Sequence, residues 1–389
     1  MRSSYFQKNL QIFYSIPTND KLYILILMQI ILSFTVLLLG IIISSAFFAT
    51  GLLWFSSQNK QSNRFLALLI FTISLWLIDH FLRIAGIYGQ NANLYFLPIF
   101  YSFAFGPLIY FYVKSLVNQS FILQKRDYLH FLPVLFQAGL YLFLSTKNYD
   151  FKNWYWINVH QLITYKIEFD GTFISMLIYL GLSIQLLRNY QNYVVNNFSE
   201  TSKIRLNWLK VVLVILIILC VQWLIEIVLR DFFQLYFNYD YSIQILGIMA
   251  LVLAVGGIRQ ANLSEVNFEE EAIPKSNVQI DNLILDQIKS GMDSQKLHLN
   301  PTLSLSEFAK ELKLNPKIVS QQINTGLGKS FNDFVNEYRV EEVKKRLNSP
   351  DLERLTILGI AYESGFNSKT TFNRIFKDFT GVAPRDFLE

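Results

Sequence analysis

The sequence has 389 residues, of which 52% are apolar and only 16% are charged. Soluble domains carry about a quarter charged residues, so this composition excludes a chain that is soluble throughout. The formal net charge is only +5, and residues 281–389 hold 15 basic and 15 acidic side chains, so any nucleic-acid surface must be local. Long apolar runs extend from Lys21 to Gly257, and the chain turns polar after Leu263. We therefore expect at least two domains of different solvent class.

The apolar part contains seven stretches near the length of about 20 residues that a membrane-spanning helix needs. They are 31–55, 65–87, 95–117, 128–146, 172–190, 207–229 and 241–258. Gly106-Pro107 is predicted to break the third stretch and Pro133 the fourth. Membrane helices tolerate such breaks where neighbouring helices satisfy the freed carbonyls.

The N-terminal boundary of this part stays open. Residues 1–27 are predicted to be an extension, followed by a seven-span sensor and anchor domain at 28–259. A start at Met28 is an alternative. The stretch Ile43–Ala49 also resembles part of a signal peptide, which is the less favoured interpretation.

Basic residues between the stretches predict the orientation. Three short loops that each carry two cations are 56–64, 118–127 and 191–206. By contrast, 88–94 carries no cation and 230–240 carries one, although 147–170 carries three lysines. Short basic loops stay in the cytoplasm. The N-terminus is then outside, and residues 259–389 are inside a cell (inner) membrane.

Five ionisable residues lie within the predicted spans. Asp79, His80 and Arg83 fall in the second span, and Glu226 and Arg230 are four residues apart in the sixth, close enough to pair. One hypothesis is a ligand pocket that opens outward between these spans. The favoured alternative is contact between helices, with charged ends that reach the lipid head groups.

No catalytic or metal-binding pattern is evident. His80, His130 and His160 lie in different segments, and Cys220 offers neither a disulfide nor a thiol pair. No nucleophile has a partner base, and no glycine loop suits a phosphate. We predict no enzyme activity, no metal and no cofactor; loss of an activity on mutation of Asp79 or His80 would favour a membrane enzyme instead.

Residues 260–280 are predicted to be a linker. They carry the run Glu269-Glu270-Glu271 and Pro274, which is typical of a solvated connector. A helix that continues from the last span is the alternative.

Residues 281–389 contain a first pattern of two short helices. Ser304 and Glu307 form a capping box, and Asn315 and Pro316 suit the start of a second helix that ends near Thr325. The predicted inward residues are Phe308, Ala309, Leu312, Ile318, Val319 and Ile323. The predicted outward residues are Lys317, Ser320, Gln321 and Asn324.

The same pattern returns after a longer helix at 332–348. Thr356 caps a third short helix, Gly365 suits a turn with positive φ, and Ser368 caps the last helix. In that helix the inward residues are Phe372, Ile375, Phe376 and Phe379, at helical spacing. The outward residues are Lys369, Thr370, Asn373, Arg374 and Lys377.

These outward faces carry the side chains that read a major groove. Arg can bond guanine, Asn and Gln can bond adenine, and Lys and Thr can reach bases or phosphates. A charged stripe alone would favour a plain helical bundle with a solvated polar face. The repeated arrangement of cap, short helix, turn and capped helix favours DNA binding.

Two stretches carry a family resemblance: KSFNDFVNEYRVEEVKKRL, and ILGIAYESGFNSKTTFNRIFKDFTGVAPRDF with its core GF-x-S-x-x-x-F-x-R-x-F-K. Residues 283–389 thereby resemble the DNA-binding domain of AraC/XylS-type transcription regulators. The resemblance implies two helix-turn-helix units joined by one helix. It places base-facing residues at Lys317, Ser320, Gln321, Lys369, Thr370 and Arg374. The stretches FGPLIYFYVKSL and KRDYLHFLPVLF are more loosely similar to a seven-span sensor region of a membrane-bound subgroup.

We therefore expect an all-α chain with a seven-helix transmembrane bundle, followed by a cytoplasmic helical DNA-binding domain at 281–389. Its expected function is that of a membrane-anchored, sequence-specific transcription regulator. The expected partners are double-stranded DNA, the lipid bilayer and an unknown small-molecule or protein signal; a homodimer and RNA polymerase are left open. The alternative is a membrane receptor whose C-terminal bundle binds a protein.

Overall fold

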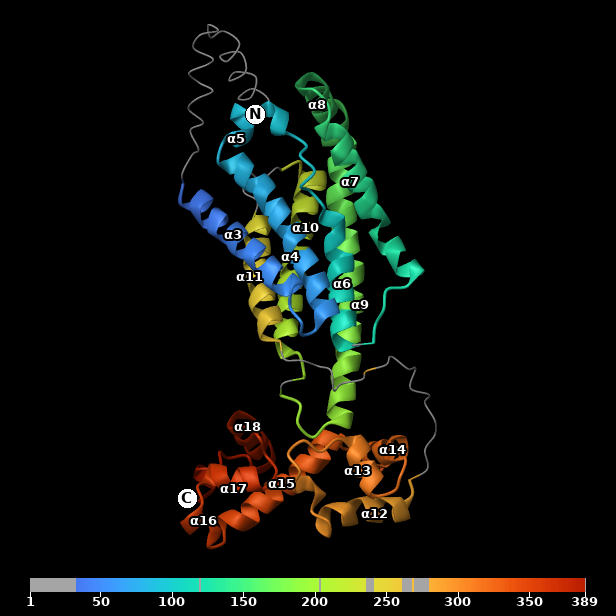
Figure 1. The fold of residues 1–389 in the computed structure, drawn as a ribbon, viewed down its shortest axis with the longest axis vertical. Coiled ribbons are helices and arrows are strands. Elements are labelled where there is room, and N and C mark those ends of the chain that lie inside the picture. The colour runs from blue at the N-terminus through green and yellow to red at the C-terminus, as the bar shows by residue number, and fades with distance from the viewer. Residues whose placement is uncertain are drawn as a thin grey trace. The chain divides into compact units, whose positions relative to one another are not determined.

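The computed structural model describes residues 33–118, 120–202, 204–235, 241–260, 268 and 280–388. Two compact units emerge. The first holds the described residues of Met1–Leu186 and Asn207–Asn267, and the second those of Leu187–Leu206 and Phe268–Glu389. The described residues confirm the all-helical class (Figure 1). The extension 1–27 and nearly all of the predicted linker 260–280 lie outside them.

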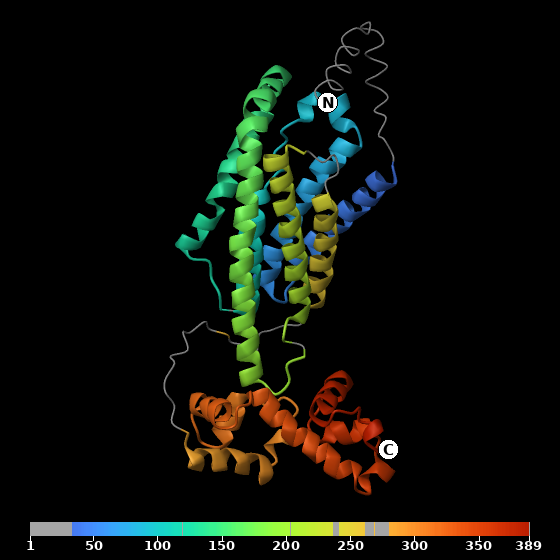
Figure 2. The same cartoon turned by 180° about the vertical axis from the view of Figure 1, so that it is seen from behind.

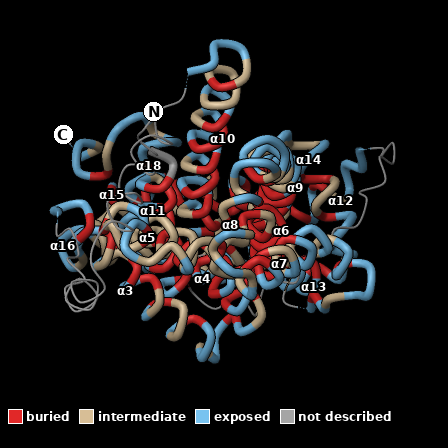
Figure 3. Tube along the Cα trace, turned by 90° about the horizontal axis from the view of Figure 1, so that it is seen from above, coloured by how far each residue is buried: buried red, intermediate tan, exposed pale blue. Residues whose placement is uncertain are grey.

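The first unit is built from long apolar helices. They are α3 (Phe34–Trp54), α4 (Lys60–Ile84), α6 (Phe105–Val117), α7 (Leu132–Ser145), α9 (Tyr165–Asn197, which ends in the second unit), α10 (Asn207–Phe233) and α11 (Tyr241–Arg259), with the short α5 (Ile87–Gln90) and α8 (Tyr149–Tyr155). Helix α4 packs against α3, α6 and α11, and α10 packs against α11. Figure 3 shows α6 as buried along most of its length. Helix α9, drawn in green in Figure 2, has 33 residues and is the longest of the described helices.

Five helical stretches are long and apolar enough to cross a bilayer. They are Phe34–Trp54, Lys60–Ile84, Lys125–Ser145, Tyr149–Asn197 and Asn207–Phe233. Two further apolar helices, Ser102–Val117 and Ile243–Arg259, are shorter. Each of the seven predicted stretches therefore contains a helix, and the count of seven spans stays a prediction.

Large apolar side chains lie exposed on the outside of these helices. Examples are Phe34, Ile41, Phe48, Phe136, Ile178 and Val211. A face in water with so many exposed apolar side chains would be costly, and monomeric soluble proteins rarely keep one. Lipid tails are as apolar as these side chains, so the surface suits a bilayer.

The break predicted at Gly106-Pro107 is wrong. The stretch 95–117 becomes helical only at Ser102, and Pro107 lies in the first turn of α6. A proline there costs no hydrogen bond within the helix, so it helps begin the helix. In the fourth stretch, Pro133 likewise lies in the first turn of α7, directly after a 3-10 helix (η3, Lys125–Phe131), and Lys125–Ser145 runs on as one helical stretch, so the break predicted there is also wrong.

The predicted connection between spans at 147–170 is largely helical. It contains α8, a π-helical stretch (Trp156–Thr164) and the first turn of α9. Aromatic packing explains the difference: the His160 ring stacks on Trp156, with centroids 4.9 Å apart, and meets Phe96 edge-on. Packing of this kind stabilises a helix that local sequence does not predict.

Among its described residues, the second unit contains eight further helical segments before the short 3-10 helix η6 (Asp386–Leu388). They are α12 (Asn282–Asp293), η5 (Leu297–Leu299), α13 (Leu305–Glu311), α14 (Pro316–Gly326), α15 (Phe331–Leu347), α16 (Asp351–Arg354), α17 (Ile357–Glu363) and α18 (Lys369–Thr380). One apolar core joins α12, α13, α14 and the first half of α15. Another joins the second half of α15 to α17 and α18. Helix α15 therefore contributes to both cores (Figure 1).

Candidate nucleic-acid interface

The first helix-turn-helix unit begins with the predicted capping box. Ser304 Oγ accepts from the Glu307 amide at 3.3 Å, and Glu307 returns a carboxylate oxygen to the Ser304 amide at 2.9 Å. Asn315 caps α14 by accepting from the Lys317 amide at 2.9 Å, with Pro316 in the first turn. Both helix starts are therefore fixed by local hydrogen bonds.

The second unit repeats these starts. Thr356 Oγ1 accepts from the Gly359 amide at 3.1 Å, and Ser368 Oγ accepts from the Thr371 amide at 3.4 Å. These caps confirm the predicted beginnings of α17 and α18. Gly381 ends α18 in the left-handed conformation.

The turns of the two units share one hydrogen-bond pattern. The Leu314 amide donates to the Ala309 carbonyl at 2.9 Å, and the Phe366 amide donates to the Ala361 carbonyl at 3.1 Å. The residue before each donor has a positive φ, 57° at Lys313 and 95° at Gly365. The repeat seen in the sequence is thus also a repeat of backbone geometry.

Helix α18 separates its apolar and polar sides. Phe372, Ile375 and Phe376 are buried in the second core. The exposed side chains of α18 include Lys369, Thr370, Asn373, Arg374 and Lys377. Phe379 is 41% exposed and does not belong to the buried face, so its predicted inward position is wrong. It lies in the last turn of α18.

Arg374 forms an exposed ion pair with Asp378 on the same helix. Its Nη1 lies 3.2 Å from an Asp378 carboxylate oxygen, one turn further on. Exposed ion pairs of this kind contribute about 0–1 kcal/mol. The guanidinium can therefore exchange Asp378 for a guanine edge at little cost.

The polar and apolar side chains of α14 are less clearly separated on opposite sides of the helix than those of α18. Lys317 is exposed, while Ser320 and Gln321 are half-buried. Val319 and Ile323 are buried as predicted, but Ile318 is 40% exposed, because the first core closes over the other side of α14. Asn324 donates to Ser320 Oγ at 3.3 Å.

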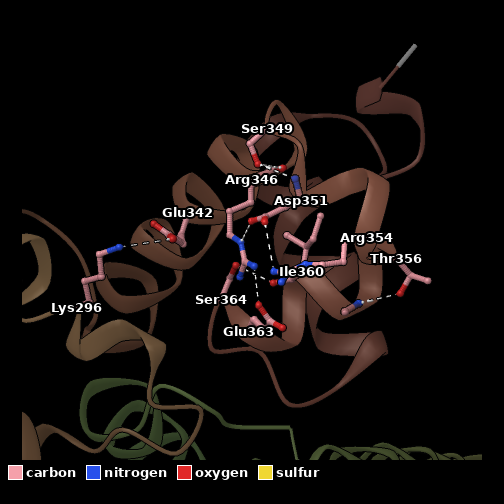
Figure 4. Close-up of polar contacts among 11 residues, drawn as sticks. Lys296, Glu342, Arg346, Ser349, Asp351, Arg354, Thr356, Ile360, Glu363 and Ser364 are labelled. Atoms are coloured by element: carbon pink, nitrogen blue, oxygen red, sulfur yellow. Dashed lines mark hydrogen bonds and ion pairs between the residues drawn. The ribbon is translucent and has the colours of Figure 1, made fainter.

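An ion-pair cluster ties the end of α15 to the second unit. Arg346 donates to Asp351 and to Glu363, each at 2.6 Å (Figure 4). These two carboxylates raise the pKa of Arg346. The cluster fixes α16 and α17 against α15 and leaves the exposed face of α18 untouched.

Three polar side chains that the sequence analysis did not single out are buried on the inner face of α15. Asn332, Asn336 and Arg339 are 8%, 1% and 1% exposed. They share a helical face with Val335 and Val343, and this helical spacing was the sequence signal that could have indicated their burial. The Arg339 guanidinium donates to the carbonyls of His298 and Asn300, and burial lowers its pKa to about 10.

The ionisable residues of the predicted spans form two separate sets of contacts. Asp79 accepts from Arg83 at 2.9 Å and from Tyr88 at 2.6 Å. Arg230 pairs with Asp170 at 2.8 Å and with Asp231 at 2.9 Å. Glu226, the predicted partner of Arg230, accepts instead from Gln222 at 2.8 Å. His80 lies on α4 beside Asp79.

One buried polar group in the first unit escaped the sequence reasoning. Glu168 is 5% exposed and accepts from Gln137 at 3.2 Å and from Tyr141 at 3.1 Å. Close by in this network, Ser102 and Thr172 share a hydrogen bond of 2.7 Å. Its members come from three distant segments, so no local pattern indicated it.

Two capped helix-turn-helix units that share one bridging helix define a helix-turn-helix domain. Residues 308–389 match the family model of a helix-turn-helix domain. An HTH-type transcriptional regulator of Staphylococcus aureus strain COL is 33% identical over 102 residues, which are 26% of this chain and 13% of that protein. The HTH-type transcriptional regulator YtdP of Bacillus subtilis strain 168 is 29% identical over 87 residues, 22% of this chain and 11% of YtdP. No solved structure matches this chain.

The matched regions thus amount to about 13% or less of the length of these relatives. Residues 308–389 thus form an AraC-type helix-turn-helix domain at the C-terminus of the chain. The domain and its relatives support a DNA-binding transcription regulator. Among the described residues, no group of three His, Cys, Asp or Glu side chains is placed to hold a metal ion.

Proposed function

We propose that this protein is a membrane-anchored, sequence-specific transcription regulator. The observation that carries the proposal is the repeated capped turn, which presents α14 and α18 in the same way from two cores on one helix. The second helix of such a unit enters the major groove with its N-terminal residues nearest the bases. One chain would then read two successive grooves about 34 Å apart.

The two reading helices contribute different side chains to this interface. On α18, Lys369, Thr370 and Arg374 face the bases, and Asn373 and Lys377 reach bases or phosphates. On α14 the contacts come from Lys317, Ser320 and Gln321. The weaker separation of polar and apolar faces on α14 favours a larger contribution of α18 to specificity.

The first unit is proposed to be the anchor, with residues 259–389 in the cytoplasm and the N-terminus outside. Five helices of sufficient length and an exposed apolar surface support this placement. Protease treatment of intact cells tests it: the helix-turn-helix domain should be protected until the membrane is opened. Digestion of that domain in intact cells would refute the proposed orientation.

DNA binding is tested with the full chain in lipid nanodiscs. We expect a duplex selected from a random pool to be bound with an affinity that falls steeply with salt, because phosphate contacts release counterions. A variant with Lys369, Arg374 and Lys377 changed to Ala should lose this binding. A chain that selects no duplex, but captures a protein through the same face, would favour the receptor alternative.

The signal is the least defined part of the proposal. Asp79, His80 and Arg83, and separately Glu226 and Arg230, stay candidates for a ligand pocket near the exterior. Arg230 pairs with Asp170 of α9, and the Tyr88 hydroxyl of α5 donates to Asp79 of α4, so we favour contact between helices as their role. A homodimer and contact with RNA polymerase are further partners that the proposal leaves open.

A further inference from the structure

The segment between α9 and α10 packs onto the bridging helix of the second unit. The Ser199 amide donates to the Leu303 carbonyl at 3.1 Å, and Asn332 Nδ2 donates to the Ser199 carbonyl at 2.7 Å. Arg339 Nη2 donates to Ser199 Oγ at 3.0 Å. Ser199 is only 1% exposed. We call Phe198–Thr201 the docking segment.

The docking segment directly follows α9, and the residues just beyond it are bonded back to that helix. The Tyr190 hydroxyl donates to the Ile204 carbonyl at 2.8 Å, and Gln191 Nε2 donates to the Arg205 carbonyl at 2.9 Å. These bonds close the chain between α9 and α10 onto the last turns of α9. A displacement of α9 would therefore carry the docking segment with it.

Arg339 connects the docking segment to both helix-turn-helix units. Its Nε and Nη2 bond the His298 and Asn300 carbonyls, which precede α13. Its guanidinium also lies 6.0 Å from the centre of the Phe366 ring, in the turn before α18. Along α15, Val335 belongs to the first core and Val340 to the second, so Arg339 stands at the junction of the two.

We propose that the docking segment is the control contact through which the apolar unit acts on DNA binding. When it is docked, Arg339 donates to Ser199 as well as to the His298 and Asn300 carbonyls, and the two helix-turn-helix units keep one fixed spacing, so α14 and α18 can engage one duplex together. When α9 moves and the segment leaves, Arg339 loses Ser199 and each unit binds on its own. This inference rests on the proposed function, because it concerns how the two reading helices cooperate.

The test compares two duplexes with the full chain in nanodiscs. The first duplex is selected from a random pool by the unmodified chain, and the second has one half-site scrambled. The ratio of the two affinities measures cooperation between the units. The variants are Ser199→Ala, Asn332→Ala and the double variant; Asn348→Ala, at the exposed far end of α15, is the matched control.

Asn332→Ala should lower the affinity ratio about tenfold and leave binding to the scrambled duplex unchanged. Hydrogen exchange at 198–201 should rise in this variant, while α15 stays protected. Ser199 and Asn332 belong to the same contact. The affinity ratio of the double variant should therefore fall no further than that of the more affected single variant. The control should behave like the unmodified chain.

Two results would overturn the inference. One is an unchanged affinity ratio in a variant whose segment 198–201 exchanges freely. The other is free exchange of the Ser199 amide in the unmodified chain, which would mean that the segment is not docked. A chain that selects no duplex at all refutes the proposed function instead, and protection of Ser199 would then still support the docking itself.

Discussion

Lys313 and Gly365 occupy the same position in the two turns, and both have a left-handed backbone, with φ of 57° and 95°. Their amides donate to equivalent carbonyls three residues back, Lys310 at 3.0 Å and Tyr362 at 3.2 Å. The same left-handed turn is therefore formed by glycine in the second unit and by lysine in the first, where the Cβ of Lys313 makes this conformation strained.

Gly365→Ala should destabilise the second helix-turn-helix unit. An added Cβ would lie 2.3 Å from the His298 carbonyl oxygen, in a backbone conformation that alanine rarely adopts. We expect the free energy of opening of α17 and α18 to fall by about 2 kcal/mol, measured by hydrogen exchange on the full chain in detergent. Gly359→Ala is the control and should cost nothing, because its Cβ would meet Thr356 Oγ1 at 3.4 Å and two Leu355 carbons at 3.7 and 3.8 Å, all ordinary contacts, in a helical conformation.

Lys313→Gly should have the opposite effect on the first unit. Glycine relieves the left-handed strain, which we expect to raise the free energy of opening of α13 and α14 by about 1 kcal/mol. Lys310→Gly, the same substitution within α13, should instead lower it by about 1 kcal/mol. Equal effects of the two changes in hydrogen exchange would show that the turn at Lys313 is unstrained.

Arg374→Ala should weaken specific DNA binding by about 1–3 kcal/mol and relax the base preference at one position. The reason is the loss of a bidentate contact to guanine. Quantitative binding to the selected duplex and its single-base variants, at fixed salt, measures both effects. Arg354→Ala, a change of the same charge on α16, should leave binding unchanged; full retention by Arg374→Ala would contradict the assigned docking of α18.

The second unit should lose stability as the pH falls below 6.5. Burial lowers the pKa of His298 from its ordinary value of 6.5, and Glu342 opposes this only in part. The unfolded chain then binds a proton that the folded chain does not, so acid favours unfolding.

His298→Phe keeps a ring against Tyr338, whose centroid lies 5.9 Å from that of His298. The variant should show a flatter dependence of α15 protection on pH as the pH falls below 6.5, after correction for intrinsic exchange rates. Identical profiles for the variant and the unmodified chain would assign the acid sensitivity to other groups.

Local patterns predicted much of the DNA-binding domain. The caps at Ser304, Asn315, Thr356 and Ser368 follow from side chains that bond amides two or three residues away. Gly365 was predicted to lie in a turn because few other residues adopt a positive φ. The outward residues of α18 follow from helical spacing alone, although their contacts with DNA stay a prediction.

The pairing of charges could not be predicted in this way. Glu226 and Arg230 have the spacing of a helical ion pair, yet Arg230 bonds Asp170, 60 residues away in the sequence. The helical content of 147–170 depends on rings brought from another segment, such as Phe96. Both outcomes depend on which helices pack together.

The sequence by itself determined that apolar helices precede a paired helix-turn-helix domain, because length, hydropathy and capping act over a few neighbouring residues. Only the tertiary structure decided that Arg339 is buried and bonds Ser199, 140 residues away. A buried guanidinium needs acceptors for its donors, and those acceptors are carbonyls and a hydroxyl that the fold alone brings to one place.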